Sequence, residues 1–170
     1  QENVGEAENA EHFAREAIFV ICNSGMKHTV ARRIFNRGME ALECGLPAAN
    51  GFGHAGKTAA INRIWYERDG LFAQYQKSTD KLAFCEGLPW VGCVTKYHLA
   101  KNLGLDVAKP DVHLVRLAAA DGTTPAQLCG RIAAATGYRV ATVDLILWFA
   151  CARGVIDSRA EDPFVWKQGA

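Results

Sequence analysis

Residues 88–117 read LPWVGCVTKYHLAKNLGLDVAKPDVHLVRL, and this stretch decides the fold. A tight connection begins at Leu88-Pro89, and apolar residues then recur at helical spacing over 93–103. Gly104 predicts the end of that helix, because glycine readily adopts the left-handed conformation that terminates helices. Lys109-Pro110-Asp111 then introduces a further helix over 112–120. The stretch therefore predicts two helices, each preceded by a short loop.

The rest of the chain has the same helical period. Further helices are expected over 10–21, 29–42, 56–66, 71–75, 79–85, 125–136 and 140–152. Thr124 and Gln127 have the spacing of a capping box, with proline at the first helical position. Alternating strand patterns with hairpin turns are absent. We predict an all-α, compact domain over 17–170, preceded by an acidic segment, 1–16, that can form part of the first helix.

Composition excludes several classes of protein. The 170 residues are 49% hydrophobic and 22% charged, which argues against disorder and coiled coil. No apolar stretch reaches the roughly 18–20 residues of a membrane span, and the polar first residues do not resemble a signal peptide. The six cysteines lie at least eight positions apart, so no metal or iron–sulfur site is expected. We expect free thiols, no cofactor and a cytoplasmic location.

Charge is unevenly distributed along the chain. Residues 1–16 hold five Glu and one Arg, so the remaining residues carry a net charge of +5. Basic residues gather at positions 27, 32, 33 and 37, at 57 and 63, and at 96, 101, 109 and 116. Each group is either a solvated helix face or a contact surface for a polyanion.

Gly51 to Thr58, GFGHAGKT, matches the phosphate-binding pattern G-x-x-x-x-G-K-[ST]. In nucleotide-binding folds this loop follows a buried parallel strand, but residues 44–50 are typical of a turn. No apolar run ending in Asp follows to hold magnesium. We interpret the segment as a glycine-rich helix start and keep a P-loop nucleotide-binding protein as a weaker alternative. Lys57 can still meet a backbone phosphate.

The connection around Gly92 is a second candidate phosphate site. Two short helices joined by a tight Pro/Gly turn present amides to one phosphate, and the dipole of the second helix strengthens the contact. The candidate contact residues are Val91, Gly92, Val94, Thr95, Lys57 and Lys96. Lys109-Pro110-Asp111 ends nineteen residues after Gly92. Hairpin, helix and Pro-Asp at this spacing are together more specific than any of them alone.

This combination resembles the helix-hairpin-helix superfamily of base-excision DNA glycosylases, firmly over 88–117 and weakly over most of the chain. The likeness implies an all-helical fold of two lobes, with double-stranded DNA bound across the groove between them. It places Asp111 at the family's essential carboxylate, and Val91 and Gly92 in the phosphate-binding hairpin.

The sequence departs from the family pattern at two positions of the hairpin. Trp90 stands where the hairpin usually has its first glycine, so the loop is either reshaped or given an aromatic contact. Val94 occupies the position of the Schiff-base lysine of bifunctional members. Lys96 lies about 200° further around the helix and does not simply replace it. With no iron–sulfur cysteine cluster, the likeness implies a monofunctional enzyme.

Asp111 suits the chemistry of glycosidic cleavage. Positive charge builds on the sugar as the base departs, and a carboxylate beneath the anomeric carbon stabilises it and orients the attacking water. A helix N-terminus would keep that carboxylate ionised. The alternative is that Asp111 only caps its helix, and both roles are compatible.

A base inside duplex DNA must be flipped out before it can be excised. The loop over 23–27 is a candidate to fill the resulting gap, through Ser24 and Met26. Candidates for the base pocket or wedge are Trp65, Tyr66, Trp90, Tyr97 and His113, although aromatic residues at helical spacing are more often core.

The sequence thus predicts a monofunctional DNA glycosylase that hydrolyses the N-glycosidic bond of a damaged or modified base and leaves an abasic site. The role is base excision repair or antiviral excision of modified bases from viral DNA. A non-catalytic helix-hairpin-helix DNA-binding module is the main alternative, and a bifunctional lyase is weaker. The expected partner is double-stranded DNA with a flipped base, with no membrane and no obligate protein partner.

Overall fold

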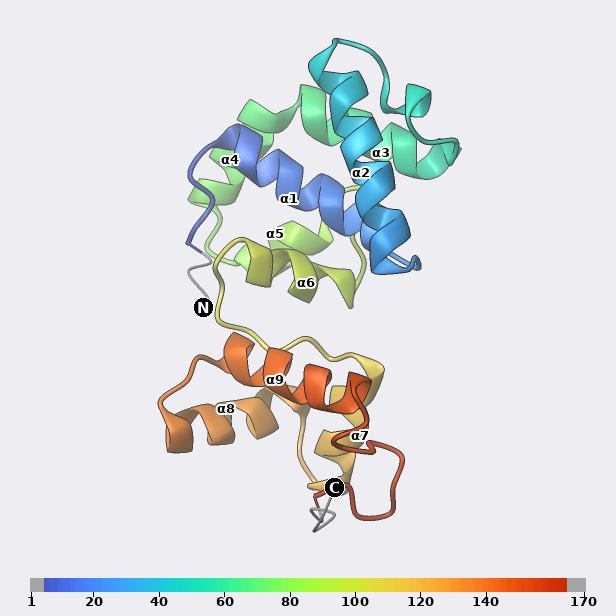
Figure 1. Ribbon diagram of the computed structural model, residues 1–170. Helices are drawn as coiled ribbons and strands as arrows, with labels where there is room; N and C mark the ends of the chain where they lie inside the picture. The colour runs from blue at the N-terminus through green and yellow to red at the C-terminus, as the bar shows by residue number, and fades with distance from the viewer. Residues whose placement is uncertain (1–4, 165–170) are drawn as a thin grey trace. The chain divides into compact units, whose positions relative to one another are not determined.

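The structure, a computed structural model, describes residues 5–164, and over these residues it is all-helical (Figure 1). The helices are α1 (Ala10–Asn23), α2 (His28–Glu43), α3 (Ala55–Tyr66), α4 (Arg68–Lys77), α5 (Lys81–Glu86), α6 (Thr95–Asn102), α7 (Val112–Ala120), α8 (Pro125–Thr136) and α9 (Val140–Ala152), with a 3-10 turn η1 (Ala48–Asn50). No strand occurs between residues 5 and 164. The predicted all-α class is confirmed.

The chain divides after Gly104 into two compact units. The N-terminal unit contains α1 to α6, and the C-terminal unit contains α7 to α9. The domain predicted over 17–170 therefore comprises two units, each with its own buried side chains. Of the predicted acidic segment, residues 10–16 lie in α1 and 5–9 precede it, while 1–4 lie outside the described residues.

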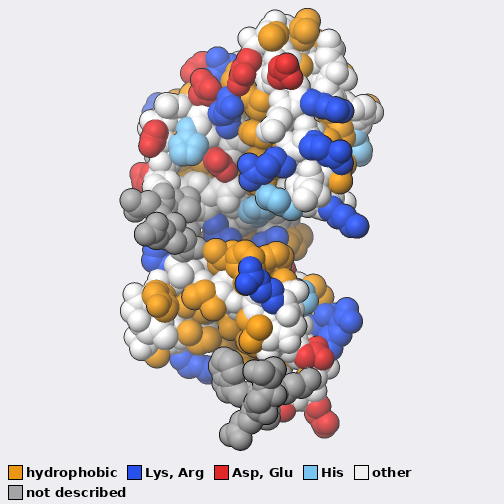
Figure 2. Space-filling view, in the orientation of Figure 1, with side chains coloured by type: hydrophobic (Ala, Val, Ile, Leu, Met, Phe, Trp, Pro, Cys, Tyr) orange, Lys and Arg blue, Asp and Glu red, His pale blue; other side chains and the backbone are white. Residues whose placement is uncertain are grey.

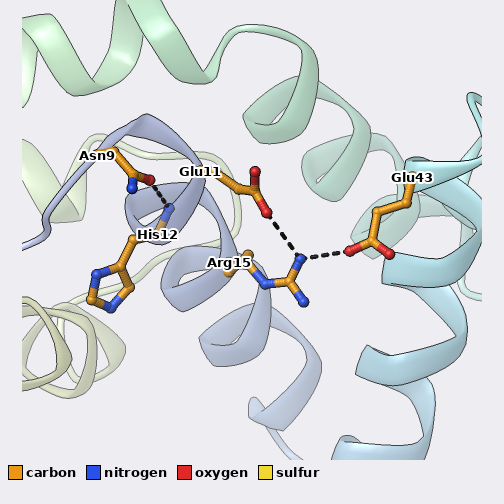
Figure 3. Close-up of polar contacts among 5 residues, drawn as sticks. All are labelled: Asn9, Glu11, His12, Arg15 and Glu43. Atoms are coloured by element: carbon orange, nitrogen blue, oxygen red, sulfur yellow. Dashed lines mark hydrogen bonds and ion pairs between the residues drawn. The ribbon is translucent and has the colours of Figure 1, made fainter.

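Helix α1 is the centre of the N-terminal unit. Its apolar residues are buried on several faces because α2, α3, α4 and α6 all pack against it (Figure 1). Phe13, Ile18 and Ile21 are completely buried, and each contributes roughly 1.5–3 kcal/mol by leaving water. Asn9 caps the helix (Figure 3). Arg15 pairs with Glu11 of the same helix at 3.3 Å and joins α1 to α2 by pairing with Glu43 at 2.6 Å.

The C-terminal unit is built on two small apolar clusters. Leu114 of α7 packs with Cys129 of α8 and Val143 of α9 in the first cluster. The second contains Leu117, Leu128 and Cys151. Helix α8 begins with the predicted capping box and Pro125, and its C-cap Gly137 has a φ of 76°. The sequence thus correctly predicted both ends of this helix.

No single helix in residues 5–164 has the length and apolar content of a membrane span. Helices α8 and α9 have that length and apolar content only when they are counted together, and the chain bends by 107° between them.

Candidate functional site

The connection between α5 and α6 begins with a hydrogen-bonded turn and ends at the N-terminus of α6, which has no side-chain cap. Within the turn, the N–H of Val91 donates to the carbonyl of Leu88 at 3.1 Å. The N–H of Gly92 donates to Oγ1 of Thr95 at 2.8 Å. Both predicted phosphate-binding amides therefore already have partners, and Val91 is buried. Within the turn, these two N–H groups are engaged by the protein itself.

The next three amides are the available ones. The N–H groups of Cys93, Val94 and Thr95 have no hydrogen-bond partner among residues 5–164. They precede the first i→i−4 bond of the helix, from Lys96 N–H to the Gly92 carbonyl at 2.9 Å, and Val94 as N-cap provides no side-chain cap. Orphan amides and the positive end of the helix dipole favour an anion here. Of the predicted contacts, Val94 and Thr95 fit best.

Lys96 is paired with an acid across the two helices. Its Nζ lies 2.6 Å from Oε2 of Glu86, and this hydrogen bond raises the pKa of the Lys96 amine. The ammonium also lies 5.5 Å from the ring centroid of Tyr97. A phosphate contact by Lys96 would have to compete with Glu86, so this residue also braces α6 against α5.

Trp90 has a left-handed backbone conformation, which is more usual for glycine. Its φ is 65°, and it is the one residue other than glycine with a positive φ in residues 5–164. Its ring lies edge-on to His54 at 5.2 Å and so close to Gly56 that a Cβ there would be 2.6 Å from Cζ3. The left-handed backbone costs on the order of 1 kcal/mol for a bulky residue, and this packing offsets it.

Lys57 is buried inside the protein. Only 4% of the residue is exposed, and its Nζ donates to the carbonyl of Ser24 at 2.6 Å and approaches that of Cys22 at 3.5 Å. Burial lowers the pKa of the Lys57 amine and raises that of the Cys22 thiol to about 11. The predicted phosphate contact by Lys57 is therefore wrong, because the amine faces the end of α1. No strand precedes the glycine-rich segment in the described chain.

The loop between α1 and α2 is attached to the hairpin through this glycine-rich segment. Ser24 is held by Lys57, whose neighbour Gly56 contacts Trp90. Gly25 takes a φ of 70°, and Met26 N–H donates to the Asn23 carbonyl at 3.2 Å. The loop that carries the predicted wedge residues Ser24 and Met26 is thus connected to the hairpin through the adjacent residues Gly56 and Lys57.

Two of the predicted pocket residues, Trp65 and Tyr66, differ in burial. Trp65 is 7% exposed and packs in the core with Arg68 at 4.5 Å over its ring, whereas Tyr66 is exposed. A hollow of about 430 Å³ in the N-terminal unit is lined by other residues, among them His12, Glu16, Phe19 and Arg32. The pocket prediction is therefore wrong for Trp65, whose indole is a core side chain.

Asp111 caps α7. Its Oδ1 accepts from the N–H groups of His113 at 2.9 Å and Leu114 at 3.0 Å. Its Oδ2 accepts no hydrogen bond from the described residues. Both roles foreseen for Asp111 remain compatible, because one oxygen caps the helix and the other is free to act.

A polar cluster that the sequence did not reveal lies beside Asp111. Nδ1 of His113 is 2.9 Å from Oγ of Ser158, a buried residue that also bonds the thiol of Cys151. Burial, and then the charge of Asp111, raise the pKa of Cys151. His113 therefore ties the segment after α9 to the start of α7 instead of lining an aromatic pocket. Ser158 lies 45 residues away in sequence, so no local pattern could have indicated it.

Within residues 5–164, no group of three or more His, Cys, Asp or Glu side chains is placed to hold a metal ion. Comparison with protein-family models, curated proteins and solved structures found no match for this chain.

Proposed function

We propose that this protein is a monofunctional DNA glycosylase whose essential carboxylate is Asp111. The observation that carries the proposal is the state of that carboxylate at the N-terminus of α7. Two backbone amides fix Oδ1 at 2.9 and 3.0 Å and leave Oδ2 without a partner in the described chain. An ionised, oriented carboxylate is what an oxocarbenium-like transition state requires.

The chemistry follows from that geometry. The bond between the anomeric carbon and the base nitrogen breaks, and its electrons leave with the base. Asp111 stabilises the positive charge on the sugar and orients a water, which attacks the anomeric carbon. The water gives one proton to solvent, and the departed base takes one up from solvent. The products are a free base and an abasic site. Val94, where the resemblance puts a Schiff-base lysine in bifunctional relatives, supports hydrolysis over a lyase step.

DNA binding is supported by the start of α6. The free N–H groups of Cys93, Val94 and Thr95 suit a single backbone phosphate, and the left-handed Trp90 maintains the turn that precedes them. Flipping a base costs a few kcal/mol, which such phosphate contacts help to offset. Repair of damaged bases and excision of modified bases from viral DNA use the same reaction.

Asp111→Asn tests the proposal sharply. Asparagine caps helices as well as aspartate does, so the variant keeps the fold and loses only the charge. We expect base release to fall at least 10³-fold, roughly 4 kcal/mol of transition-state stabilisation, while DNA affinity is unchanged or tighter. The assay is mass spectrometry of bases released from methylated, deaminated, oxidised and phage-derived modified DNA, with alkali cleavage at abasic sites.

Asp111→Ala is the matched control for the capping role. It removes both charge and cap, and we expect it to lower the free energy of unfolding by about 1 kcal/mol, unlike Asp111→Asn. Full base release by Asp111→Asn would refute the catalytic role.

A non-catalytic DNA-binding module is the second candidate, favoured by the fact that capping alone accounts for Asp111. It predicts salt-dependent binding of DNA and no abasic product from any of these substrates.

A further inference from the structure

Helix α2 begins in a basic stretch of the chain. Residues 27–39 contain Lys27, Arg32, Arg33 and Arg37 and no Asp or Glu. Lys and Arg side chains follow this helix across the surface of the N-terminal unit (Figure 2). Here, the basic face of α2 means the side chains of Arg32, Arg33 and Arg37.

The basic face is exposed and lacks acidic partners. All three arginines are exposed, and none forms an ion pair with residues 5–164. The guanidinium of Arg32 lies over the ring of Phe19, 5.5 Å from its centroid. Other arginines differ, because Arg63 pairs with Glu67 at 3.2 Å and Arg131 with Asp121 at 2.6 Å. Arg32 shares a hollow with Glu16, and Arg37 shares one with Glu40, without an ion pair in either case. The charges of Arg33 and Arg37 are therefore the ones available to an external anion.

The stability of α2 does not explain these charges. Arg33 and Arg37 are four residues apart, about 6 Å along the axis, where like charges repel. The helix has no acid in its first turn, and its N-cap Lys27 makes no side-chain cap. An external anion between Arg33 and Arg37 would relieve this repulsion.

We infer that the basic face of α2 is a binding surface for the phosphate backbone of duplex DNA, separate from the hairpin. This inference rests on the proposed function for the identity of the polyanion. Duplex DNA presents one charge per about 1.7 Å, so neighbouring cations meet several phosphates at once. Asn36, between Arg33 and Arg37, is also polar and exposed, and the face lacks the large apolar side chains by which helices insert into lipid.

The test compares two double variants of the full chain that have the same net charge. Arg33→Ala with Arg37→Ala removes two unpaired charges from α2. Arg63→Ala with Arg131→Ala removes two charges that already have acidic partners. Affinity for a short undamaged duplex is measured by fluorescence anisotropy between about 50 and 200 mM salt. We expect the slope of log K against log salt to become shallower by about 1.8 in the α2 variant, 0.9 per lost phosphate contact, and to change little in the control.

We expect the α2 variant to fold, because removing the repulsion between the two arginines should leave α2 at least as stable. Circular dichroism checks that its helix content is unchanged. Equal slopes in all three proteins, or equal losses in both variants, would overturn the inference. Binding to anionic lipid vesicles without binding to DNA would overturn it too.

The proposed function is judged by a separate readout in the same samples. Base release by the wild type with equal salt slopes would refute the α2 surface alone. A shallower slope in the α2 variant, with no base release by the wild type, would refute the glycosylase alone.

Discussion

Gly56 and Lys57 are adjacent in the glycine-rich segment, yet they serve different parts of the N-terminal unit. Gly56 leaves room for the ring of Trp90, and Lys57 holds the carbonyl of Ser24. The pattern predicted a helix start, which α3 confirms, with His54 accepting from Lys57 N–H at 3.3 Å. The burial of the amine was not predictable, because it depends on α1, more than thirty residues earlier.

We predict that Gly56→Ala displaces the indole of Trp90 and lowers the free energy of unfolding by about 1–3 kcal/mol, as expected of overpacking. A Cβ at this position would lie 2.6 Å from Trp90 Cζ3. The measurement is urea unfolding together with the chemical shifts of the Trp90 indole and the Val94 amide. Gly53→Ala is the control in the same segment, since a Cβ there meets nothing within 4 Å. Identical behaviour of the two variants would show that Trp90 does not pack on Gly56.

At the scale of elements, local signals predicted the helices better than they predicted the helix ends. The capping box of α8 predicted 125–136, as observed. Helix α4 was expected over 71–75 but spans Arg68–Lys77, and the turn η1 was not expected. These additions depend on tertiary contacts, because α4 packs on α1 and η1 packs on α2 and α3. Apolar periodicity reports only the residues that face the core.

Short helices show this dependence most clearly. Helix α5 has six residues, is capped by Asp80 and is anchored by Cys85, which is completely buried. Burial raises the pKa of the Cys85 thiol from 9.0 to about 12. Above pH 9 the unfolded chain therefore loses a proton that the folded chain keeps, so the free energy of unfolding falls as pH rises toward 12.

We predict that Cys85→Ala makes this alkaline loss of stability smaller by about 1 kcal/mol between pH 8 and pH 10. The variant is less stable at every pH because it leaves a small cavity, so the informative quantity is the change with pH. Urea unfolding at the two pH values measures it, with Cys44→Ala as the control at an exposed thiol. An unchanged pH dependence in Cys85→Ala would show that this thiol does not stay protonated in the fold.

At the scale of the whole molecule, two cores replace the single one that composition suggested. Helix α6 completes the core of the N-terminal unit, where Leu99 and Leu103 are completely buried. Leu114, Leu117 and Leu128 are buried in clusters of the C-terminal unit. Length and composition set the total number of apolar side chains, but they do not determine whether those side chains form one hydrophobic core or two.

We predict that a fragment of residues 3–104 folds on its own, because its buried side chains find their partners within it. It should keep a helical circular dichroism spectrum and unfold cooperatively in urea. A fragment that ends at residue 94 is the control, since it lacks α6 and should lose cooperativity. Non-cooperative unfolding of the longer fragment would mean that the two units fold only together.

The sequence by itself determined the all-α class, the capped start of α8 and the position of Asp111 at a helix N-terminus. Those features depend on residues within one or two helical turns of one another, where spacing and side-chain type set the backbone hydrogen bonds. Only the tertiary structure decided that Lys57 is buried, that Trp90 packs on Gly56, and that Ser158 joins His113. Each of these contacts joins residues at least 33 positions apart, and its stability comes from burial and packing that no local pattern contains.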